Sequence, residues 1–266
     1  MSRSVSAVIL AAGKGTRMKS DLPKVAHPCA GRAIVEWVVD ACAAAGCGRV
    51  IVVVGYQQEV VRGILSHRRA GWPPIEFAVQ TEQLGTGHAV ACARGLLEQE
   101  AKTPGHTVFV LAGDGPLIRA ETLAALRRRH EQSGASATLA TSVIDDPSGY
   151  GRIVRDARGR FTGIVEQKGA TPEQLAIREV NPSYYCFDAR ALFSTLARVE
   201  RNPVSGEYYI TDVPSLLMAE GARVEVVGAV PPEDVLSINT PEQLAEVERV
   251  LTARLGQPAR AGGSAA

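Results

Sequence analysis

Short runs of consecutive apolar, mostly β-branched residues recur along the first half of the chain, and they limit the possible fold more than any other feature. The run VIVVV at 50–54 is apolar at every position, so a strand there must be buried on both faces. Further runs lie at 5–10, 75–79, 108–111 and 137–143. Residues with helical apolar spacing separate them, at 33–45, 58–65, 88–97 and 121–130. This alternation predicts an α/β fold with a mostly parallel central sheet flanked by helices.

The pattern changes after residue 145, where strands follow one another with fewer helices between them. Strands are expected at 150–154, 161–166 and 179–187, which predicts a smaller mixed β subregion over 145–212. A helix at 189–196, a strand at 224–227 and a last helix at 241–255 complete one expected domain over 1–255. Residues 256–266 are rich in Gly, Ala and Pro, which predicts a disordered tail.

Composition excludes several classes of protein. Lys and Arg total 29 and Asp and Glu 28, so the net charge of +1 offers no broad basic field for nucleic acid. No apolar run approaches the roughly 20 residues that a bilayer requires. The five cysteines are odd in number and contain no C-x-x-C pair, which favours reduced and mostly buried thiols. These features predict a cytoplasmic protein that binds neither nucleic acid nor membrane.

The first expected strand is followed by a glycine-rich, basic stretch, AAGKGTRMKSDLPK, at 11–24. This stretch is not a P-loop, because Gly15 follows Lys14 where that motif requires Ser or Thr. It is not a complete dinucleotide fingerprint either, because Met18 replaces the third glycine.

The pattern that remains is a longer phosphate-binding loop. Gly13 and Gly15 allow backbone N–H groups to approach phosphate oxygens. Arg17 supplies a forked donor and Lys24 a point charge. An ordinary strand-to-helix turn with solvated cations is the alternative for this stretch taken alone.

The stretch LAAGKGTRMKSDLPK resembles the signature of the sugar-nucleotidyltransferases. Four further segments follow in that family's order: QTEQLGTGHA at 80–89, DDPSGYGRI at 145–153, GIVEQK at 163–168 and GEYYITD at 206–212. Together, from about 6 to 251, they resemble the uridylyltransferase domain of the bifunctional N-acetylglucosamine-1-phosphate uridyltransferases. The resemblance implies a Rossmann-like nucleotidyltransferase fold.

The implied reaction is an in-line attack by a sugar 1-phosphate oxygen on the α-phosphorus of UTP, which releases pyrophosphate. The favoured acceptor is N-acetylglucosamine 1-phosphate, and the implied cofactor is Mg²⁺. One alternative keeps this chemistry but uses another sugar 1-phosphate or another pyrimidine nucleotide. An alternative of a different class is a catalytically silent module that binds nucleotide sugars.

The resemblance also assigns roles to individual residues. It implies Arg17, Lys24 and Asp114 as catalytic residues, and Asp114 with Asn239 as metal ligands. The implied nucleotide-binding residues are Leu10, Ala11, Ala12, Gly13, Gly15, Gln80, Gln83, Gly85 and Thr86, with the amide of Gln80 on the uracil edge. The implied residues for the acceptor sugar are Gly151, Glu166 and Asn181. Asp114 could instead cap the turn toward the helix near Arg119, and Asn239 could cap the last helix.

Three departures from the family pattern qualify these assignments. Ala112 stands where an aromatic residue is usual, and Pro182-Ser183 follows Asn181 where Thr-Gly is usual. The change after Asn181 bears on which acceptor sugar the site takes, and Ala112 on packing near the ribose or the metal. The chain also ends shortly after Leu255. We therefore expect neither the family's hexapeptide-repeat acetyltransferase domain nor the trimer that this domain forms. The sequence does not give the oligomeric state.

Overall fold

A parallel sheet with one reversed strand forms the centre of the computed structural model, which describes residues 5–67 and 69–256. Seven strands of these residues join in the order β13-β7-β12-β6-β1-β4-β5. Their bounds are β1 Val5–Ala11, β4 Arg49–Val54, β5 Ile75–Val79, β6 Thr107–Ala112, β7 Ala137–Ala140, β12 Tyr184–Asp188 and β13 Val224–Val227. Strand β12 runs antiparallel to both β6 and β7, and the other pairs are parallel. The predicted mostly parallel sheet is confirmed.

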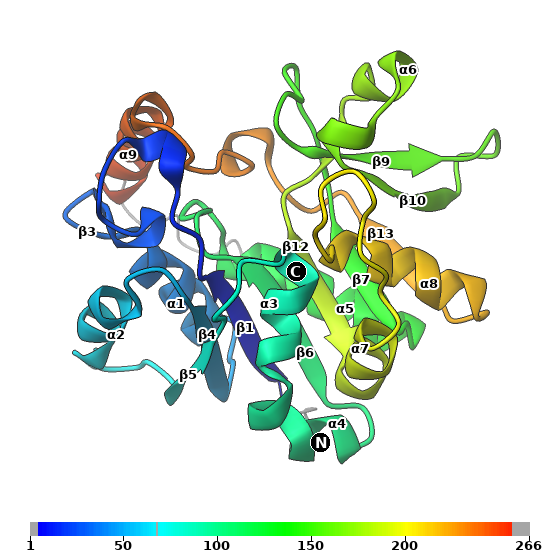
Figure 1. Cartoon of the computed structure of the whole chain (residues 1–266), viewed down its shortest axis with the longest axis horizontal. Helices are drawn as coiled ribbons and strands as arrows, with labels where there is room; N and C mark the ends of the chain where they lie inside the picture. The colour runs from blue at the N-terminus through cyan, green and yellow to red at the C-terminus, as the bar shows by residue number, and fades with distance from the viewer. Residues whose placement is uncertain (1–4, 68, 257–266) are drawn as a thin grey trace, which may run out of the picture.

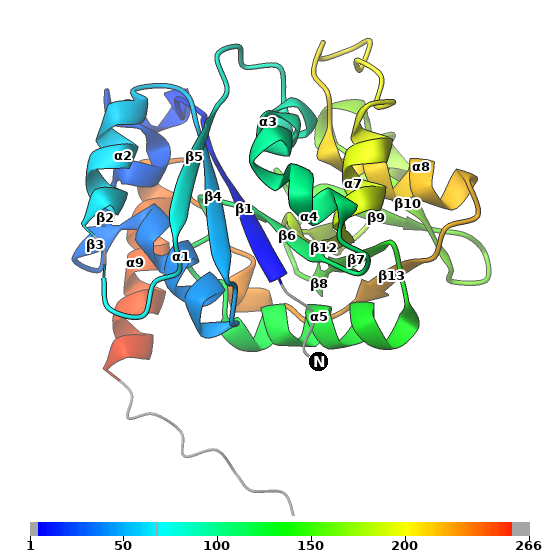
Figure 2. The same ribbon diagram turned by 90° about the horizontal axis from the view of Figure 1, so that it is seen from below.

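Helices cover both faces of this sheet because its central strands are apolar on both faces. Ile9 and Val52 belong to a core with α1 (Ile34–Ala44), α2 (Gln58–Ser66) and α5 (Ala120–Ser133). Val8 and Ile51 belong to the opposite core with α3 (Thr86–Cys92), α7 (Ala189–Leu196) and α8 (Val213–Ala219). Figure 2 shows α1 and α5 on one side of the sheet, and α3, α7 and α8 on the other.

A second, antiparallel sheet lies beside the first. It contains β8 (Ser142–Val143), β9 (Gly151–Arg155), β10 (Phe161–Val165) and β11 (Glu179–Asn181), with the short helix α6 (Pro172–Leu175) before β11. Its strand order is β10-β9-β11-β8. The sheet is at the upper right of Figure 1. This sheet corresponds to the mixed β region expected after residue 145.

Two predicted strands are wrong because each is divided between the two sheets. The strand expected at 137–143 divides at Thr141, whose N–H still bonds Val227 in the first sheet while Ser142 pairs with Val180 in the second. The strand expected at 179–187 divides after Asn181, since Pro182 has no N–H to donate and Ser183 has a φ of +63°. The helix expected at 88–97 is also divided, into α3 and a 3-10 turn at Arg94–Leu97. The short helix α4 (Glu98–Lys102) follows.

The last helix brings the end of the chain back over its beginning. Helix α9 (Pro241–Leu255) has the predicted bounds, and the Thr240 side chain caps it by accepting from the Gln243 N–H. Its buried residues pack with Met18, Ile34 and Leu117. The hairpin of β2 (Pro28–Cys29) and β3 (Arg32–Ala33) contacts α9 through β2. Gly256 ends α9, and 257–266 of the predicted tail lie outside the described residues.

The described residues also bear on the predictions from composition. All five cysteines are free thiols, and every one except Cys92 is buried. Between residues 5 and 256, apart from residue 68, no helix has both the length and the apolar character needed to cross a bilayer.

Candidate functional site

A cavity of about 410 Å³ opens between the two sheets. The carboxyl ends of β1 and β6 form one side of it, because parallel strands end at the same edge of a sheet and ligands collect there. The second sheet forms the other side through Gly151 and Asn181. The cavity thus joins the region predicted for a nucleotide to the region predicted for a sugar.

Every predicted site residue except Gly15 lines this cavity: Leu10, Ala11, Ala12, Gly13, Arg17, Lys24, Gln80, Gln83, Gly85, Thr86, Asp114, Gly151, Glu166, Asn181 and Asn239. Gly15 has a φ of +70°, and a Cβ atom there would lie 2.6 Å from the Cβ of Lys24. That Gly15 contacts the nucleotide stays a prediction. In this structure the missing side chain lets the chain of Lys24 pass close behind the loop.

Four polar side chains from distant segments meet at the end of β6. Lys24 Nζ forms an ion pair with Asp114 and lies 2.9 Å from Asn239 Oδ1. Arg17 Nη2 donates to the same Asn239 oxygen at 2.9 Å. The side chains of Lys24 and Asp114 are each 18% exposed, so the pair is mostly shielded from water yet open to the cavity. We call Arg17, Lys24, Asp114 and Asn239 the phosphate cluster.

This arrangement contradicts the two capping alternatives. Asn239 does not cap α9, because Thr240 occupies that position and accepts the bond from Gln243. Asp114 does not cap α5 either, since the N-cap of α5 is Arg119 and no side chain accepts from the first turn. Both polar groups therefore face the cavity.

Two of the segments that carried the family resemblance are joined by hydrogen bonds to form one wall. The Gly87 N–H donates to Tyr208 O at 2.7 Å, and the Ile210 N–H donates to Thr86 Oγ1 at 3.1 Å. Gly85 has a φ of +96°, and a Cβ there would lie 2.6 Å from Tyr208 O. Glycine is therefore required at 85 because the backbone of Tyr208 approaches it closely.

Gln80 is buried at the base of this wall. Its Nε2 donates to Gly85 O at 3.0 Å and lies 3.2 Å from His88 Nδ1. These contacts fix the orientation of the amide, whose residue lines the cavity.

Glu166 and Asn181 line the acceptor side of the cavity. Glu166 Oε1 accepts from the Thr211 hydroxyl at 3.0 Å. Burial raises the pKa of Glu166, and the nearby carboxylates of Asp212 and Glu207 raise it further. Asn181 Nδ2 donates to Tyr185 Oη at 2.6 Å. Its Oδ1 accepts from the Ser183 N–H at 3.2 Å.

Tyr150 and Ser237 are among the cavity residues that sequence reasoning missed. The Tyr150 hydroxyl donates to Val235 O at 3.1 Å and accepts from the Ser237 N–H at 3.3 Å. It thereby ties the start of the second sheet to the segment that carries Asn239. Tyr150 lies between two glycines in the quoted segment GYGRI, and that position could have identified it. Burial raises the pKa of its hydroxyl.

The donor set of the phosphate cluster fits Mg²⁺. Asp114 and Asn239 direct one carboxylate and one amide oxygen at the same cation, which is Lys24 Nζ in this structure. Mg²⁺ prefers such hard oxygens and needs only one or two from the protein beside waters and phosphates. Over 5–67 and 69–256, no group of three or more His, Cys, Asp or Glu side chains is placed to hold a metal.

Known proteins match both the sequence and the fold. A family model described as the MobA-like NTP transferase domain matches residues 7–203. The bifunctional protein GlmU of Heliobacterium modesticaldum is 48% identical over 250 residues, which cover 94% of this chain and 52% of that protein. The GlmU of Geobacter metallireducens is 44% identical over 255 residues, with shares of 95% and 52%. The chain therefore spans about half the length of these curated relatives.

A solved structure, that of UDP-glucose pyrophosphorylase complexed with UDP-glucose, has a similar fold. The two superpose with a TM-score of 0.72 and 16% identity, over 94% of this chain and 99% of the other. The nucleotidyltransferase fold predicted from the sequence is confirmed.

Proposed function

Because this chain belongs to the family of MobA-like NTP transferase domains, we propose that it transfers a uridylyl group from UTP to N-acetylglucosamine 1-phosphate. The products are UDP-N-acetylglucosamine and pyrophosphate. The observation that carries the proposal is the convergence of Arg17, Lys24, Asp114 and Asn239 on one edge of the cavity, opposite Glu166 and Asn181. The proposal includes a single catalytic domain over 1–255, an acceptor subregion over 145–212 and a cytoplasmic location.

Both substrates are polyanions, so the main task of the site is to hold them in line and to offset their charge. Arg17 and Lys24 approach the cavity from the loop after β1 and bind the phosphates of UTP. The backbone at 10–13 lies alongside the nucleotide. Asp114 and Asn239 would hold Mg²⁺, which would supply further positive charge beside the phosphates.

The remaining cavity residues distinguish the base from the sugar. The Gln80 side chain can present its amide oxygen as an acceptor to the uracil edge, while its amide nitrogen already donates to Gly85 O. Glu166 accepts hydroxyl hydrogens of the acceptor sugar, and Asn181 faces its acetamido group. Because Tyr185 Oη accepts one N–H of Asn181 and the Asn181 Oδ1 accepts from the Ser183 N–H, this residue has fewer free donors and acceptors than an unconstrained asparagine. This observation favours a second candidate, a uridylyltransferase for a sugar 1-phosphate without the acetamido group.

A substrate panel tests the proposal. Pyrophosphate release should be fastest with UTP and N-acetylglucosamine 1-phosphate, and should require Mg²⁺. CTP, and glucose 1-phosphate in place of the amino sugar, should react much more slowly. Activity confined to glucose 1-phosphate would select the second candidate. If the protein bound UDP-sugar but released no pyrophosphate with any pair, the catalytically silent binding module would be the correct description.

The raised pKa of Glu166 gives a prediction with opposite effects on stability and on binding. A carboxyl group whose pKa is higher in the folded protein than in the unfolded chain disfavours folding when it is ionised. This cost in folding free energy is absent at pH values well below the ordinary pKa of 4.5, and it is complete at pH values above the raised pKa. Glu166→Gln should therefore raise the melting temperature at pH 8 and change it less at pH 4.

The same variant should raise the KM for the acceptor about tenfold or more, because a hydrogen bond to a charged group is lost. The KM for UTP should stay within about twofold, since Glu166 lies on the acceptor side. Thermal melts at both pH values and steady-state kinetics check this pair of results. Equal increases in both KM values would show that Glu166 does not contact the acceptor alone.

A further inference from the structure

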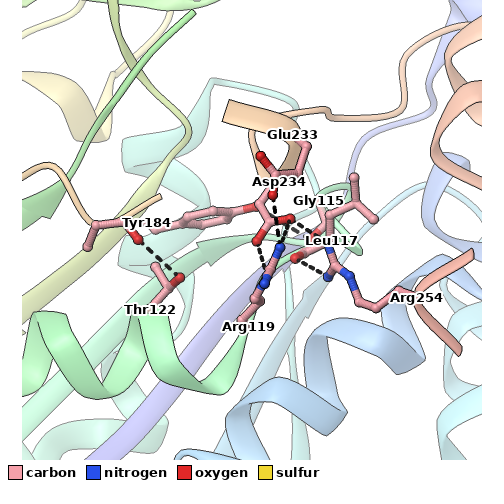
Figure 3. Close-up of polar contacts among 9 residues, drawn as sticks. Gly115, Leu117, Arg119, Thr122, Tyr184, Glu233, Asp234 and Arg254 are labelled. Atoms are coloured by element: carbon pink, nitrogen blue, oxygen red, sulfur yellow. Dashed lines mark hydrogen bonds and ion pairs between the residues drawn. The ribbon is translucent and has the colours of Figure 1, made fainter. Parts of the chain in front are cut away.

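A buried carboxylate outside the cavity joins the two segments that carry the proposed metal ligands. Asp234 ends the 3-10 turn Pro232–Asp234 and is 1% exposed. Arg119 and Arg254 both form ion pairs with it, and Arg119 Nη2 also lies 3.0 Å from Asp234 Oδ1. Figure 3 shows the two guanidinium groups converging on Asp234 from different sides. We call these three residues the Asp234 clamp.

Each arginine connects Asp234 to a different part of the chain. Arg119 is the N-cap of α5 and ends the loop that begins at Asp114. Arg254 lies in the last turn of α9, and its Nη1 donates to Leu117 O at 3.0 Å within that same loop. Tyr184 supports the loop from β12, where its hydroxyl lies 3.5 Å from Gly115 O (Figure 3). The clamp therefore holds the 114–119 loop to the 232–239 segment and to α9.

The same two segments are also bonded beside the cavity. The Ile238 N–H donates to Asp114 O at 3.0 Å. One end of the 232–239 segment is thus fixed at Asp234 and the other at Ile238, next to Asn239. Both ends of the 232–239 segment are therefore bonded to the loop that carries Asp114 or to its neighbouring residues.

A contribution to folding stability does not by itself explain why the Asp234 clamp is present. Burying a carboxylate and guanidinium groups costs solvation, and apolar side chains of similar size often serve a fold equally well. We propose that Asp234 is a positioning residue, which sets the affinity of the site for its divalent cation by fixing Asn239 relative to Asp114. This inference rests on the proposed metal ligands, and Asp234 touches neither substrate nor metal.

The test is the metal dependence of Asp234→Asn, a change that removes the charge at constant size. Mn²⁺ binding to the protein with a non-hydrolysable UTP analogue, followed by electron paramagnetic resonance, should weaken roughly tenfold or more, as in other proteins that lose a group holding a metal ligand. The Mg²⁺ concentration that gives half-maximal pyrophosphate release should rise by a similar factor. Excess Mg²⁺ should restore most of the rate, and the KM for the acceptor should stay within about twofold. Asp234→Glu, which keeps the charge, should recover part of the affinity.

Arg49→Met is the matched control. Arg49 lies at the start of β4 and pairs with Glu76 and Glu100 at 2.5 Å each, at the opposite edge of the sheet from the cavity. Its loss should lower the melting temperature without changing Mn²⁺ affinity. If Asp234→Asn does not fold, Arg254→Met replaces it, because this side chain is 29% exposed and its loss should be milder.

Unchanged Mn²⁺ affinity in the folded Asp234 or Arg254 variant would overturn the inference, and so would an equal loss of affinity in Arg49→Met. The Mn²⁺ measurement needs no turnover. If the wild type binds Mn²⁺ more tightly than Asp234→Asn yet releases no pyrophosphate from any substrate pair, the positioning role stands and the proposed function fails.

Discussion

Asp114→Ala should reduce turnover at least about a hundredfold, which is the usual loss when an enzyme loses a group that stabilises developing charge. Asp114 is the carboxylate of the phosphate cluster, and its partners there are cationic or neutral. Without it, the site has only the amide oxygen of Asn239 for a divalent cation. Lys24 also loses its ion-pair partner and with it a fixed position. Pyrophosphate release at saturating UTP and Mg²⁺ measures the effect, and circular dichroism verifies the fold.

Asp145→Ala is the control for this variant. Asp145 has the same side chain, is 98% exposed and pairs only with Arg178 among the described residues, away from the cavity. Its turnover should stay within about twofold of the wild type, as is usual for surface substitutions. If Asp114→Ala kept full turnover, the metal role assigned to Asp114 would be wrong, and the charge of the phosphates would have to be offset by the cations alone.

Hydrophobic periodicity was sufficient to predict the central sheet and several helices, including α7 and α9 with their observed bounds. It was not sufficient to predict which sheet a strand joins. The segments 137–143 and 179–187 were each predicted as one strand, yet each divides between two sheets. The break at Pro182 could be read from its missing N–H, whereas the break at Thr141 involves a hydrogen bond to Val227, far away in the chain.

In the site, too, local sequence patterns predicted which residues are present but not their contacts with distant residues. The motifs indicated which residues gather around the cavity, since each motif has a recognisable local pattern. They did not indicate that Lys24 bonds both proposed metal ligands, or that Gly15 makes room for Lys24. The Asp234 clamp has no local signal either, because its arginines lie 115 and 20 residues away in the sequence.

Lys24→Met should have two effects that differ in sign. Turnover should fall about a hundredfold or more, because the phosphates lose a cation in the cavity. Binding of Mn²⁺ to the protein without nucleotide should become stronger, by at least about fivefold, the lower end of typical coupling between two sites. The reason is that Lys24 Nζ contacts both oxygens proposed to hold the metal, Asp114 Oδ2 and Asn239 Oδ1. An ammonium group and a divalent cation cannot occupy the same place.

This competition links the metal to the nucleotide. In the wild type, UTP offers Lys24 an alternative partner in its phosphates, so nucleotide binding should strengthen Mn²⁺ binding, and by the same factor Mn²⁺ should strengthen nucleotide binding. In Lys24→Met the part of that mutual effect that comes from Lys24 should disappear, so that only the direct contact of the metal with the phosphates couples the two affinities. Lys14→Met is the matched control, because Lys14 belongs to the same loop but lies over the ring of Tyr56, 5.1 Å from its centre, and does not line the cavity. Equal Mn²⁺ affinity in Lys24→Met and the wild type, measured without nucleotide, would mean that Lys24 does not compete with the metal.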